Sequence, residues 1–239
     1  MPHSRPPQTR HVLIVAHGAP ADPEPQEAAL QSLGHRVAEE LPGWDVRGAT
    51  LAAERRLEAA LAGLDAPLVY PFFMAEGWFT GTALPRRLAA AGAQGARVLA
   101  PFGTDPALPA LMVEAGRNAA AEAGIEAAGA ALLIAAHGAR GSRTAAATTL
   151  ASVAALERMS GFARVLAGFI EEPPFLADAA RRAARGVCLP FFALAAGHVV
   201  DDVPAALEQA GFEGPLLPPI GAHPGVPGLI AAALRAAAA

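Results

Sequence analysis

The sequence predicts an α/β protein of two tandem units, each a four-stranded parallel sheet covered by helices on both faces. Two patterns predict this fold. Short apolar runs with β-branched residues alternate regularly with segments of helical periodicity. The same landmarks then return after roughly 120 residues. With 239 residues, the chain is long enough to bury a substantial core.

The first unit contains four apolar runs, and a helical pattern follows each of them. Strands are expected near residues 11–17, 45–51, 67–73 and 96–102. Helices are expected near residues 24–41, 54–64, 84–91 and 107–123. Strict alternation of strands and helices is typical of a parallel sheet that is covered on both faces.

The second unit repeats landmarks of the first unit in the same order. At offsets of 118 to 120 residues, the pairs are His17 and His137, Gly48 and Gly168, Pro71 and Pro190, Pro85 and Pro204, Gly103 and Gly221, and Pro106 and Pro224. Residues 11–125 and 126–239 are therefore interpreted as duplicated units, joined at the Ala/Gly-rich segment 121–130. Residues 1–10 are expected to form a disordered lead-in.

Composition narrows the class of protein. A hydrophobic content of 53%, a mean hydropathy of +0.33 and 17% charged residues describe an ordered globular protein. A net charge of −4 with scattered arginines argues against a nucleic-acid surface. The longest apolar stretch, residues 127–136, is about half of the roughly 20 residues that a membrane span needs. The N-terminus lacks an apolar signal core, so we expect a cytoplasmic protein.

Ionisable residues gather just beyond the predicted strands, where open parallel sheets bind their ligands. His17 and His137 each end the first strand of their unit, and a glycine follows each histidine. Among the residues that follow these two histidines, the ionisable candidates lie in the second unit: Arg140, Arg143, Glu171, Glu172, His198 and His223. The matching residues of the first unit are Leu51, Ala52, Asp105 and, opposite His198, Phe79 or, with a gap, Trp78.

These residues also have structural interpretations. An isolated histidine such as His198 is often hydrogen-bonded beside a helix, and His223 can simply initiate a turn before Pro224. Asp201 or Asp202 can cap the following helix. The convergence of histidines and a glutamate at one end of one sheet instead favours a metal-capable or acid/base site.

The chemistry of these side chains narrows the function further. Imidazole and carboxylate ligands without thiolate suit Co²⁺, Fe²⁺, Ni²⁺ or Zn²⁺, and a neutral imidazole also accepts a proton near pH 7. The single cysteine, Cys188, lies inside an apolar run and excludes a thiolate cluster within the chain. Nucleotide-binding motifs of the G-x-x-x-x-G-K-[ST] and G-x-G-x-x-G types are absent, as is the G-x-S-x-G nucleophile motif. The sequence therefore indicates metal handling without a nucleotide.

Four segments resemble the successive motifs of the CbiX-type sirohydrochlorin chelatases, which are class II tetrapyrrole chelatases. They are AHGAR at residues 136–140, GFIEEP at 168–173, PFFALAAGHVVDDVP at 190–204 and IGAHP at 220–224. The most specific part is the string Gly-His-x-x-x-Asp-x-Pro, formed by Gly197, His198, Asp202 and Pro204. The resemblance covers the whole chain as a duplicated unit.

This resemblance implies two flavodoxin-like halves of a chelatase-like fold, fused into a pseudo-dimer within one chain, so that a monomer can act. It implies ATP-independent insertion of Co²⁺, Fe²⁺ or Ni²⁺ into sirohydrochlorin or a related tetrapyrrole, for cobalamin, siroheme or related cofactors. His137 and His198 match the metal-binding and proton-accepting histidines of the family. Glu171 matches its acidic helper, and Glu172 takes that place if the register shifts by one residue.

The remaining candidates are assigned to the tetrapyrrole. Arg140 and Arg143 can receive its carboxylates. His17, Trp78 and Phe79 belong to the degenerate first unit and are expected to line a wall of the cleft, although the two aromatic residues can equally serve as core packing. Two alternatives to catalysis remain open: a protein that carries a metal or a tetrapyrrole, and a structural remnant in which the histidines are incidental.

Overall fold

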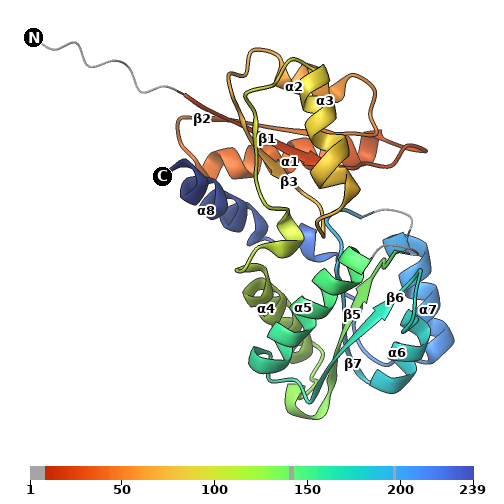
Figure 1. Ribbon diagram of the computed structural model, residues 1–239. Coiled ribbons are helices and arrows are strands. Elements are labelled where there is room, and N and C mark those ends of the chain that lie inside the picture. The colour runs from red at the N-terminus through yellow and green to blue at the C-terminus, as the bar shows by residue number, and fades with distance from the viewer. Residues whose placement is uncertain (1–8, 140–142, 196–197) are drawn as a thin grey trace, which may run out of the picture.

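Two parallel sheets form the framework of the chain, one in each sequence repeat (Figure 1). The computed structural model describes residues 9–139, 143–195 and 198–239. The first sheet has the strand order β2-β1-β3-β4, with β1 (Arg10–Ala16), β2 (Trp44–Thr50), β3 (Leu68–Pro71) and β4 (Arg97–Val98). The second sheet has the order β6-β5-β7, with β5 (Ala131–Ala136), β6 (Arg164–Phe169) and β7 (Gly186–Pro190).

Helices connect the strands in both units. The first repeat contains α1 (Glu24–Glu40), α2 (Arg56–Leu61), the π-helix η1 (Phe79–Ala83), α3 (Leu84–Ala90), the short 3₁₀-helix η2 (Phe102–Thr104) and α4 (Leu108–Glu122). After η3 (Ala127–Gly129), the second repeat contains α5 (Arg143–Met159), α6 (Leu176–Ala183), the π-helix η4 (His198–Asp202), α7 (Val203–Ala210), η5 (Ile220–Ala222) and α8 (Val226–Ala238). None of the helices in the described residues is long and apolar enough to cross a membrane.

The predicted α/β architecture with two parallel sheets is confirmed, but the prediction of four strands in each sheet is wrong for the second unit. The segment after α7 runs beside β7 through two isolated bridges, Arg185 with Glu213 and Cys188 with Leu216, rather than through a continuous ladder. Prolines at 215, 218 and 219 surround this segment. Because proline has no N–H to donate, it limits the ladder to a few bonds.

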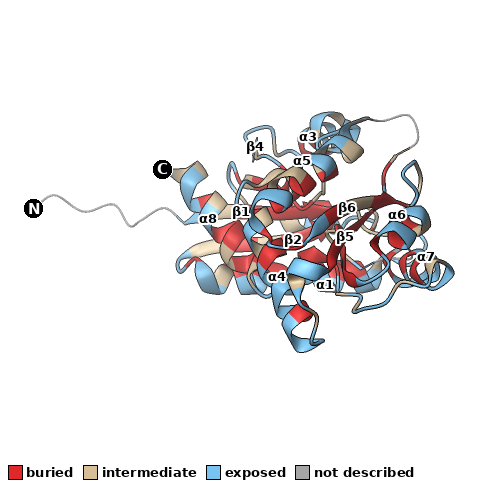
Figure 2. Cartoon of the chain, turned by 90° about the horizontal axis from the view of Figure 1, so that it is seen from below, coloured by how far each residue is buried: buried red, intermediate tan, exposed pale blue. Residues whose placement is uncertain are grey.

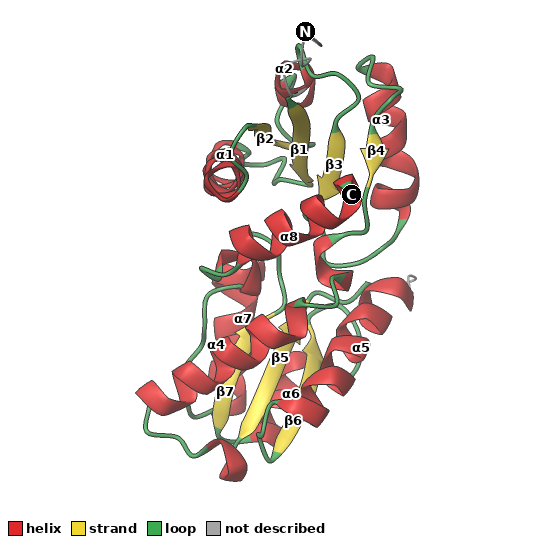
Figure 3. Cartoon of the chain, turned by 90° about the vertical axis from the view of Figure 1, so that its left-hand side faces the viewer, coloured by secondary structure: helices red, strands yellow, loops and turns green. Residues whose placement is uncertain are grey.

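Each sheet is covered on both faces, and the last helix of each repeat packs on the sheet of the other repeat (Figure 3). On the first sheet, α2 and α3 cover one face, while α1 and α8 lie on the other. On the second sheet, α6 and α7 cover one face, while α5 and α4 lie on the other. This exchange of α4 and α8 produces one hydrophobic core that runs through both units.

The central strands are buried over most or all of their length (Figure 2). Residues 12–16 of β1 and all of β5 are buried, since helices cover both faces of each sheet. A side chain that follows such a strand is held by a rigid element at the edge of the core. The carboxyl ends of β1 and β5 are therefore well suited to position reactive groups.

Gly48 and Gly168, which the sequence comparison paired at an offset of 120, face opposite sides of their sheets. A Cβ on Gly48 would lie 2.3 Å from the carbonyl oxygen of Leu30 in α1. A Cβ on Gly168 would lie 2.8 Å from the Cα of Leu176 in α6. A shift of one residue along a strand moves every side chain to the other face, so this pairing is wrong by one position.

The backbone hydrogen bonds give the correct register of the second strands. The Ala52 N–H donates to the carbonyl oxygen of His17 at 2.8 Å, and the Glu171 N–H donates to that of His137 at 2.9 Å. Glu171 therefore corresponds to Ala52 rather than to Leu51. By the same register, Glu172 corresponds to the next residue of the first unit, Ala53.

Gly103 and Gly221 occupy equivalent positions at the end of the two repeats. Each donates its N–H to the backbone carbonyl oxygen of the second phenylalanine of a Pro-Phe-Phe segment, at 2.9 and 3.0 Å. A Cβ on either glycine would lie 1.9 Å from a backbone carbonyl oxygen, that of Met74 or Ala193. Since the atom in the way belongs to the backbone, a side chain at these positions would force the chain apart.

Gly103→Ala is expected to lower the free energy of unfolding by about 1–3 kcal/mol or more, through this steric conflict. Gly228→Ala in α8 is the matched control, because nothing lies within 4 Å of its Cβ position. Chemical denaturation of both variants measures the difference. An unchanged denaturation midpoint for Gly103→Ala would contradict the close approach of the two segments.

Candidate functional site

The two units face each other with the carboxyl ends of their sheets. The Gln26 side chain, in the first turn of α1, donates to the carbonyl oxygen of Ala195 in the loop after β7 at 3.1 Å. In the loop after β3, a Cβ on Gly77 would lie 3.8 Å from the Thr144 hydroxyl in the first turn of α5. Each unit therefore reaches across to the first helix of the other, beside the residues that end β1 and β5 (Figure 1).

His17 and His137 adopt the same local arrangement at these ends. The Nδ1 atom of His17 lies 2.8 Å from the carbonyl oxygen of Gly18, and that of His137 lies 2.9 Å from the carbonyl oxygen of Gly138. A carbonyl oxygen only accepts, so Nδ1 carries the proton in both rings. The lone pair of the neutral imidazole then lies on Nε2, the atom that can take a proton or bind a metal.

Two π-helices mark the next pair of equivalent positions. The helix η1 begins at Phe79 and η4 begins at His198, and an α-helix continues directly from each of them. Phe79 is therefore the counterpart of His198, which excludes the alternative alignment with Trp78. π-Helical turns are rare and occur frequently at functional sites.

The three first-unit candidates form one aromatic cluster. The rings of His17 and Phe79 meet edge to face, with centroids 4.4 Å apart. Trp78 in turn meets Phe79 edge to face at 5.1 Å. Trp78 is 63% exposed and Phe79 is 39% exposed, so this cluster presents apolar surface rather than filling the core.

In the second unit, the structure brings His137 and the two glutamates together. His137 is exposed at the end of β5, and the half-buried Glu171 follows β6 with its N–H bonded to the carbonyl oxygen of His137. Glu172 accepts a hydrogen bond from the N–H of Ala139 at 2.8 Å. The carboxylate of Glu172 and the backbone of Glu171 thus lie beside the loop that carries His137.

Three predicted site residues are described only in part or not at all. Arg140 lies outside the described residues, and the backbone alone is described for Arg143 and His198. In the part of the chain whose side chains are described, no group of three or more His, Cys, Asp or Glu residues could hold a metal. Metal binding by His137 together with His198 stays a prediction.

His223 occupies the turn position that Asp105 holds in the first unit. Asp105 accepts a hydrogen bond from the N–H of Ala107 at 2.9 Å, and Nδ1 of His223 accepts one from the N–H of Gly225 at 3.1 Å. His223 therefore forms the turn before α8.

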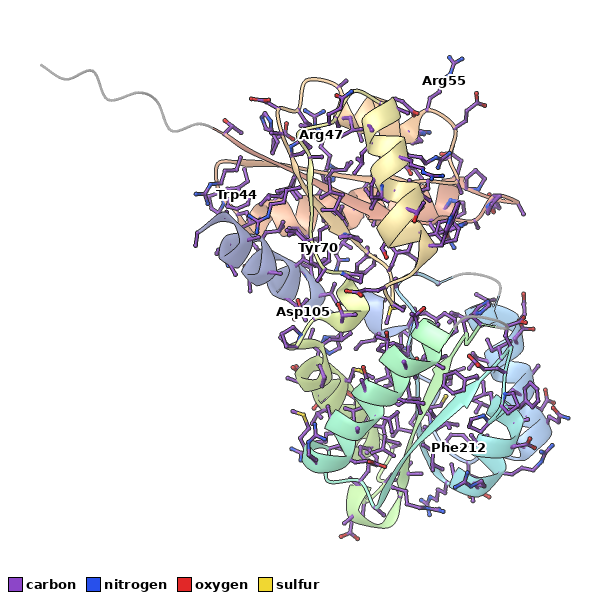
Figure 4. The ribbon with its side chains drawn as sticks, viewed as in Figure 1. Trp44, Arg47, Arg55, Tyr70, Asp105 and Phe212 are labelled. Atoms are coloured by element: carbon purple, nitrogen blue, oxygen red, sulfur yellow. The ribbon has the colours of Figure 1, made fainter. Side chains whose placement is uncertain are left out.

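Asp105 lies near Tyr70 where the two units meet (Figure 4), and burial raises the pKa of its carboxyl group.

Cys188 and Glu27 are buried groups with structural roles. Cys188 in β7 is fully buried, and burial raises the pKa of its thiol to about 12, so it is no thiolate ligand. The buried Glu27 of α1 accepts hydrogen bonds from the Thr50 N–H at 2.7 Å and the Thr50 hydroxyl at 2.8 Å. Glu27 was not singled out from the sequence, where its one signal is a carboxylate on the core-facing side of a predicted helix. It fixes the carboxyl end of β2.

Comparisons with known proteins agree with the duplicated fold. The CbiX family model matches the chain twice, at residues 11–119 and 131–237. A solved structure of CbiX, described as the terminal enzyme for biosynthesis of siroheme in denitrifying bacteria, is 51% identical with a TM-score of 0.86. The alignment covers 95% of this chain and 99% of that chain. No curated protein sequence matches the chain.

Two more distant structures share the fold. SirB from Bacillus subtilis, solved with Fe³⁺, is 16% identical with a TM-score of 0.77, and the alignment covers 97% of this chain and 96% of that one. DR2241 from Deinococcus radiodurans, a multi-domain protein with structural similarity to chelatases, is 24% identical with a TM-score of 0.70. That alignment covers 94% of this chain and 54% of DR2241.

The family model matches both repeats, and the duplicated sheets, the paired strand-end histidines and the paired π-helices give the same division of the chain. The chain therefore belongs to the CbiX family of sirohydrochlorin chelatases, as a member with two repeats.

Proposed function

We propose that the chain inserts a divalent metal, Co²⁺, Fe²⁺ or Ni²⁺, into sirohydrochlorin or a close relative without using a nucleotide. The observation that carries this proposal is the position of His137 at the carboxyl end of β5, where its Nδ1 is bonded to the carbonyl oxygen of Gly138 and its own carbonyl oxygen accepts from the Glu171 N–H. The 51% identity to a CbiX that completes siroheme biosynthesis supports the same reaction.

The reaction exchanges two pyrrole N–H protons of the macrocycle for one divalent cation. It therefore needs a group that holds the metal weakly and a group that accepts protons. His137, His198 and Glu171 supply imidazole and carboxylate, which together can serve both needs. Arg140 and Arg143 follow His137 in the sequence and are proposed to bind carboxylates of the substrate.

The second unit is proposed to be the active one. At the positions of Glu171 and His198, the first unit has Ala52 and Phe79. Of the three residues proposed for the reaction, only His137 has a counterpart of the same type, His17. The ring of Phe79 packs against the ring of His17. The first unit is therefore proposed to contribute the apolar cluster of His17, Phe79 and Trp78 as a wall against the macrocycle.

The proposed activity is tested by mixing the protein with metal-free sirohydrochlorin and each of the three metals and following the absorption change. A rate above the spontaneous one with at least one metal supports the proposal. Saturable binding of the tetrapyrrole without turnover would instead favour a carrier protein. Neither binding nor turnover would indicate a structural remnant.

Trp78→Ala is expected to weaken the binding of metal-free sirohydrochlorin about tenfold, because 63% of this side chain is exposed beside Phe79 and would lose its contact with the macrocycle. Trp44→Ala is the control: Trp44 starts β2 and lies far from the junction of the units (Figure 4). Absorption titration measures both affinities. An unchanged affinity of Trp78→Ala would leave this residue a structural role.

Two further expectations concern the protein as a whole. One chain contains both units of the pseudo-dimer, so a monomer is proposed to suffice for activity. The cytoplasmic location expected from the sequence also stays a prediction.

A further inference from the structure

The peptide group between Gly138 and Ala139 is hydrogen-bonded at both of its ends. Its carbonyl oxygen accepts from Nδ1 of His137 at 2.9 Å, and its N–H donates to Oε1 of Glu172 at 2.8 Å. A single planar amide therefore links the carboxylate of Glu172 to the imidazole of His137. Hydrogen bonds in such a chain polarise and strengthen one another.

We propose that Glu172 is a positioning residue, which holds His137 in one orientation and one tautomer through this peptide group. The proposal rests on the proposed function, because it takes His137 as a histidine that meets the metal or the pyrrole proton. Since the amide is planar, fixing the direction of its N–H also fixes the direction of its C=O. That carbonyl keeps the proton on Nδ1, so the lone pair of the neutral ring lies on Nε2.

Gly138 provides the space for this link. Its φ is +71°, a left-handed conformation that favours glycine. A Cβ at this position would lie 2.8 Å from Oε1 and 2.9 Å from Cγ of Glu172. The Glu172 side chain thus packs directly against the glycine, where no larger residue would leave room for it.

The first unit has the histidine without the carboxylate. His17 donates to the carbonyl oxygen of Gly18 at 2.8 Å, as His137 does to that of Gly138. The counterpart of Glu172 in the strand register is Ala53, whose side chain has no acceptor. The Phe79 ring packs edge to face against His17 and holds that imidazole in place of a carboxylate. The carboxylate link therefore distinguishes the unit that also contains Glu171 and His198.

This arrangement assigns different tasks to the two adjacent glutamates. Glu172 is committed to the Ala139 N–H, so its carboxylate orients the histidine loop. Glu171 donates its own N–H to the carbonyl oxygen of His137, and it is the glutamate that the proposed function assigns to the acid/base step. The choice between Glu171 and Glu172, which the sequence left open, becomes a division of roles.

Glu172→Ala and Glu172→Gln test the proposal in the full-length protein. Glu172→Ala is expected to lower kcat by about 10- to 100-fold, with KM for sirohydrochlorin unchanged. Glu172→Gln keeps an amide oxygen that can accept from Ala139, so it is expected to recover most of the lost rate. Thermal melting of both variants reports whether the fold is retained.

A spectroscopic measurement separates positioning from general stability. In ¹⁵N-labelled protein at neutral pH, His137 of the wild type is expected to show a protonated Nδ1 and an unprotonated Nε2. In Glu172→Ala, these signals are expected to move toward a mixture of tautomers, while those of His17 stay unchanged and serve as the internal control. Unchanged His137 signals in Glu172→Ala would overturn the proposal, whatever happens to the melting temperature.

The same measurement distinguishes this proposal from the proposed function. If the wild type inserts no metal, the chelatase proposal fails, and the His137 signals still decide whether Glu172 controls the tautomer. If the wild type is active and Glu172→Ala keeps the wild-type kcat, the positioning role is overturned while the chelatase activity stands.

Discussion

His137→Ala is expected to lower kcat/KM for metal insertion by about 100- to 10,000-fold, the range associated with loss of a positioned acid/base group. His17→Ala is expected to change it by less than about 10-fold. The expected loss of kcat/KM differs because the two imidazole rings have different neighbours. His137 is exposed beside Glu171, whereas His17 packs edge to face against Phe79. Steady-state assays with sirohydrochlorin and the best metal measure both values.

The two variants are closely matched controls for each other. Each removes a histidine that follows a buried strand and that donates from Nδ1 to the carbonyl oxygen of the next glycine. His17→Ala also removes the ring contact with Phe79, so thermal melting of both variants is needed to separate stability from catalysis. A larger loss for His17→Ala would show that the first unit carries the reaction, and equal losses would show that both units take part.

The sequence predicted the central strands well because they are buried on both faces. Continuous apolar runs at β1 and β5 are visible whatever lies around them. The missing eighth strand depends on prolines that limit the pairing with β7 to isolated bridges, and a short apolar run does not show this. The exchange of α4 and α8 was also hidden, since an amphipathic helix does not reveal which of two sheets it covers.

The register of β2 and β6 shows how identity between repeats can mislead. Gly48 and Gly168 are each required by a helix that packs close to the sheet, α1 in one case and α6 in the other. Because the two helices lie on opposite faces, the glycines match in type and differ in position. The correct offset of 119 followed only from the hydrogen bonds that Ala52 and Glu171 donate.

The rule that parallel sheets bind ligands at the carboxyl ends of their strands located the candidate site, but it did not give the exact pairing of residues between the two units. It identified His17 and His137, which do end equivalent strands. The choice between Phe79 and Trp78 needed the two π-helices, because an insertion in a helix leaves no simple pattern in a sequence. The bond between Glu172 and Ala139 depends on a side-chain conformation and on the strand register, neither of which the sequence states.

His198→Phe is expected to reduce metal insertion by at least about 100-fold while leaving the fold and the affinity for metal-free sirohydrochlorin largely intact. Phenylalanine is the residue that the first unit has at the start of the equivalent π-helix. The backbone at this position therefore accommodates a phenylalanine, which makes the substitution less disruptive than a charged or small residue. Chelation assays, absorption titration and thermal melting together separate catalysis, binding and folding.

The reciprocal variant, Phe79→His, supplies the control for this prediction. It places a second histidine beside His17, yet the first unit still has Ala52 where the second has Glu171. If the carboxylate is needed as well as two histidines, Phe79→His does not restore activity to the His198→Phe protein. Recovery of activity in the double variant would show that two histidines suffice, and wild-type rates for His198→Phe alone would remove His198 from the reaction.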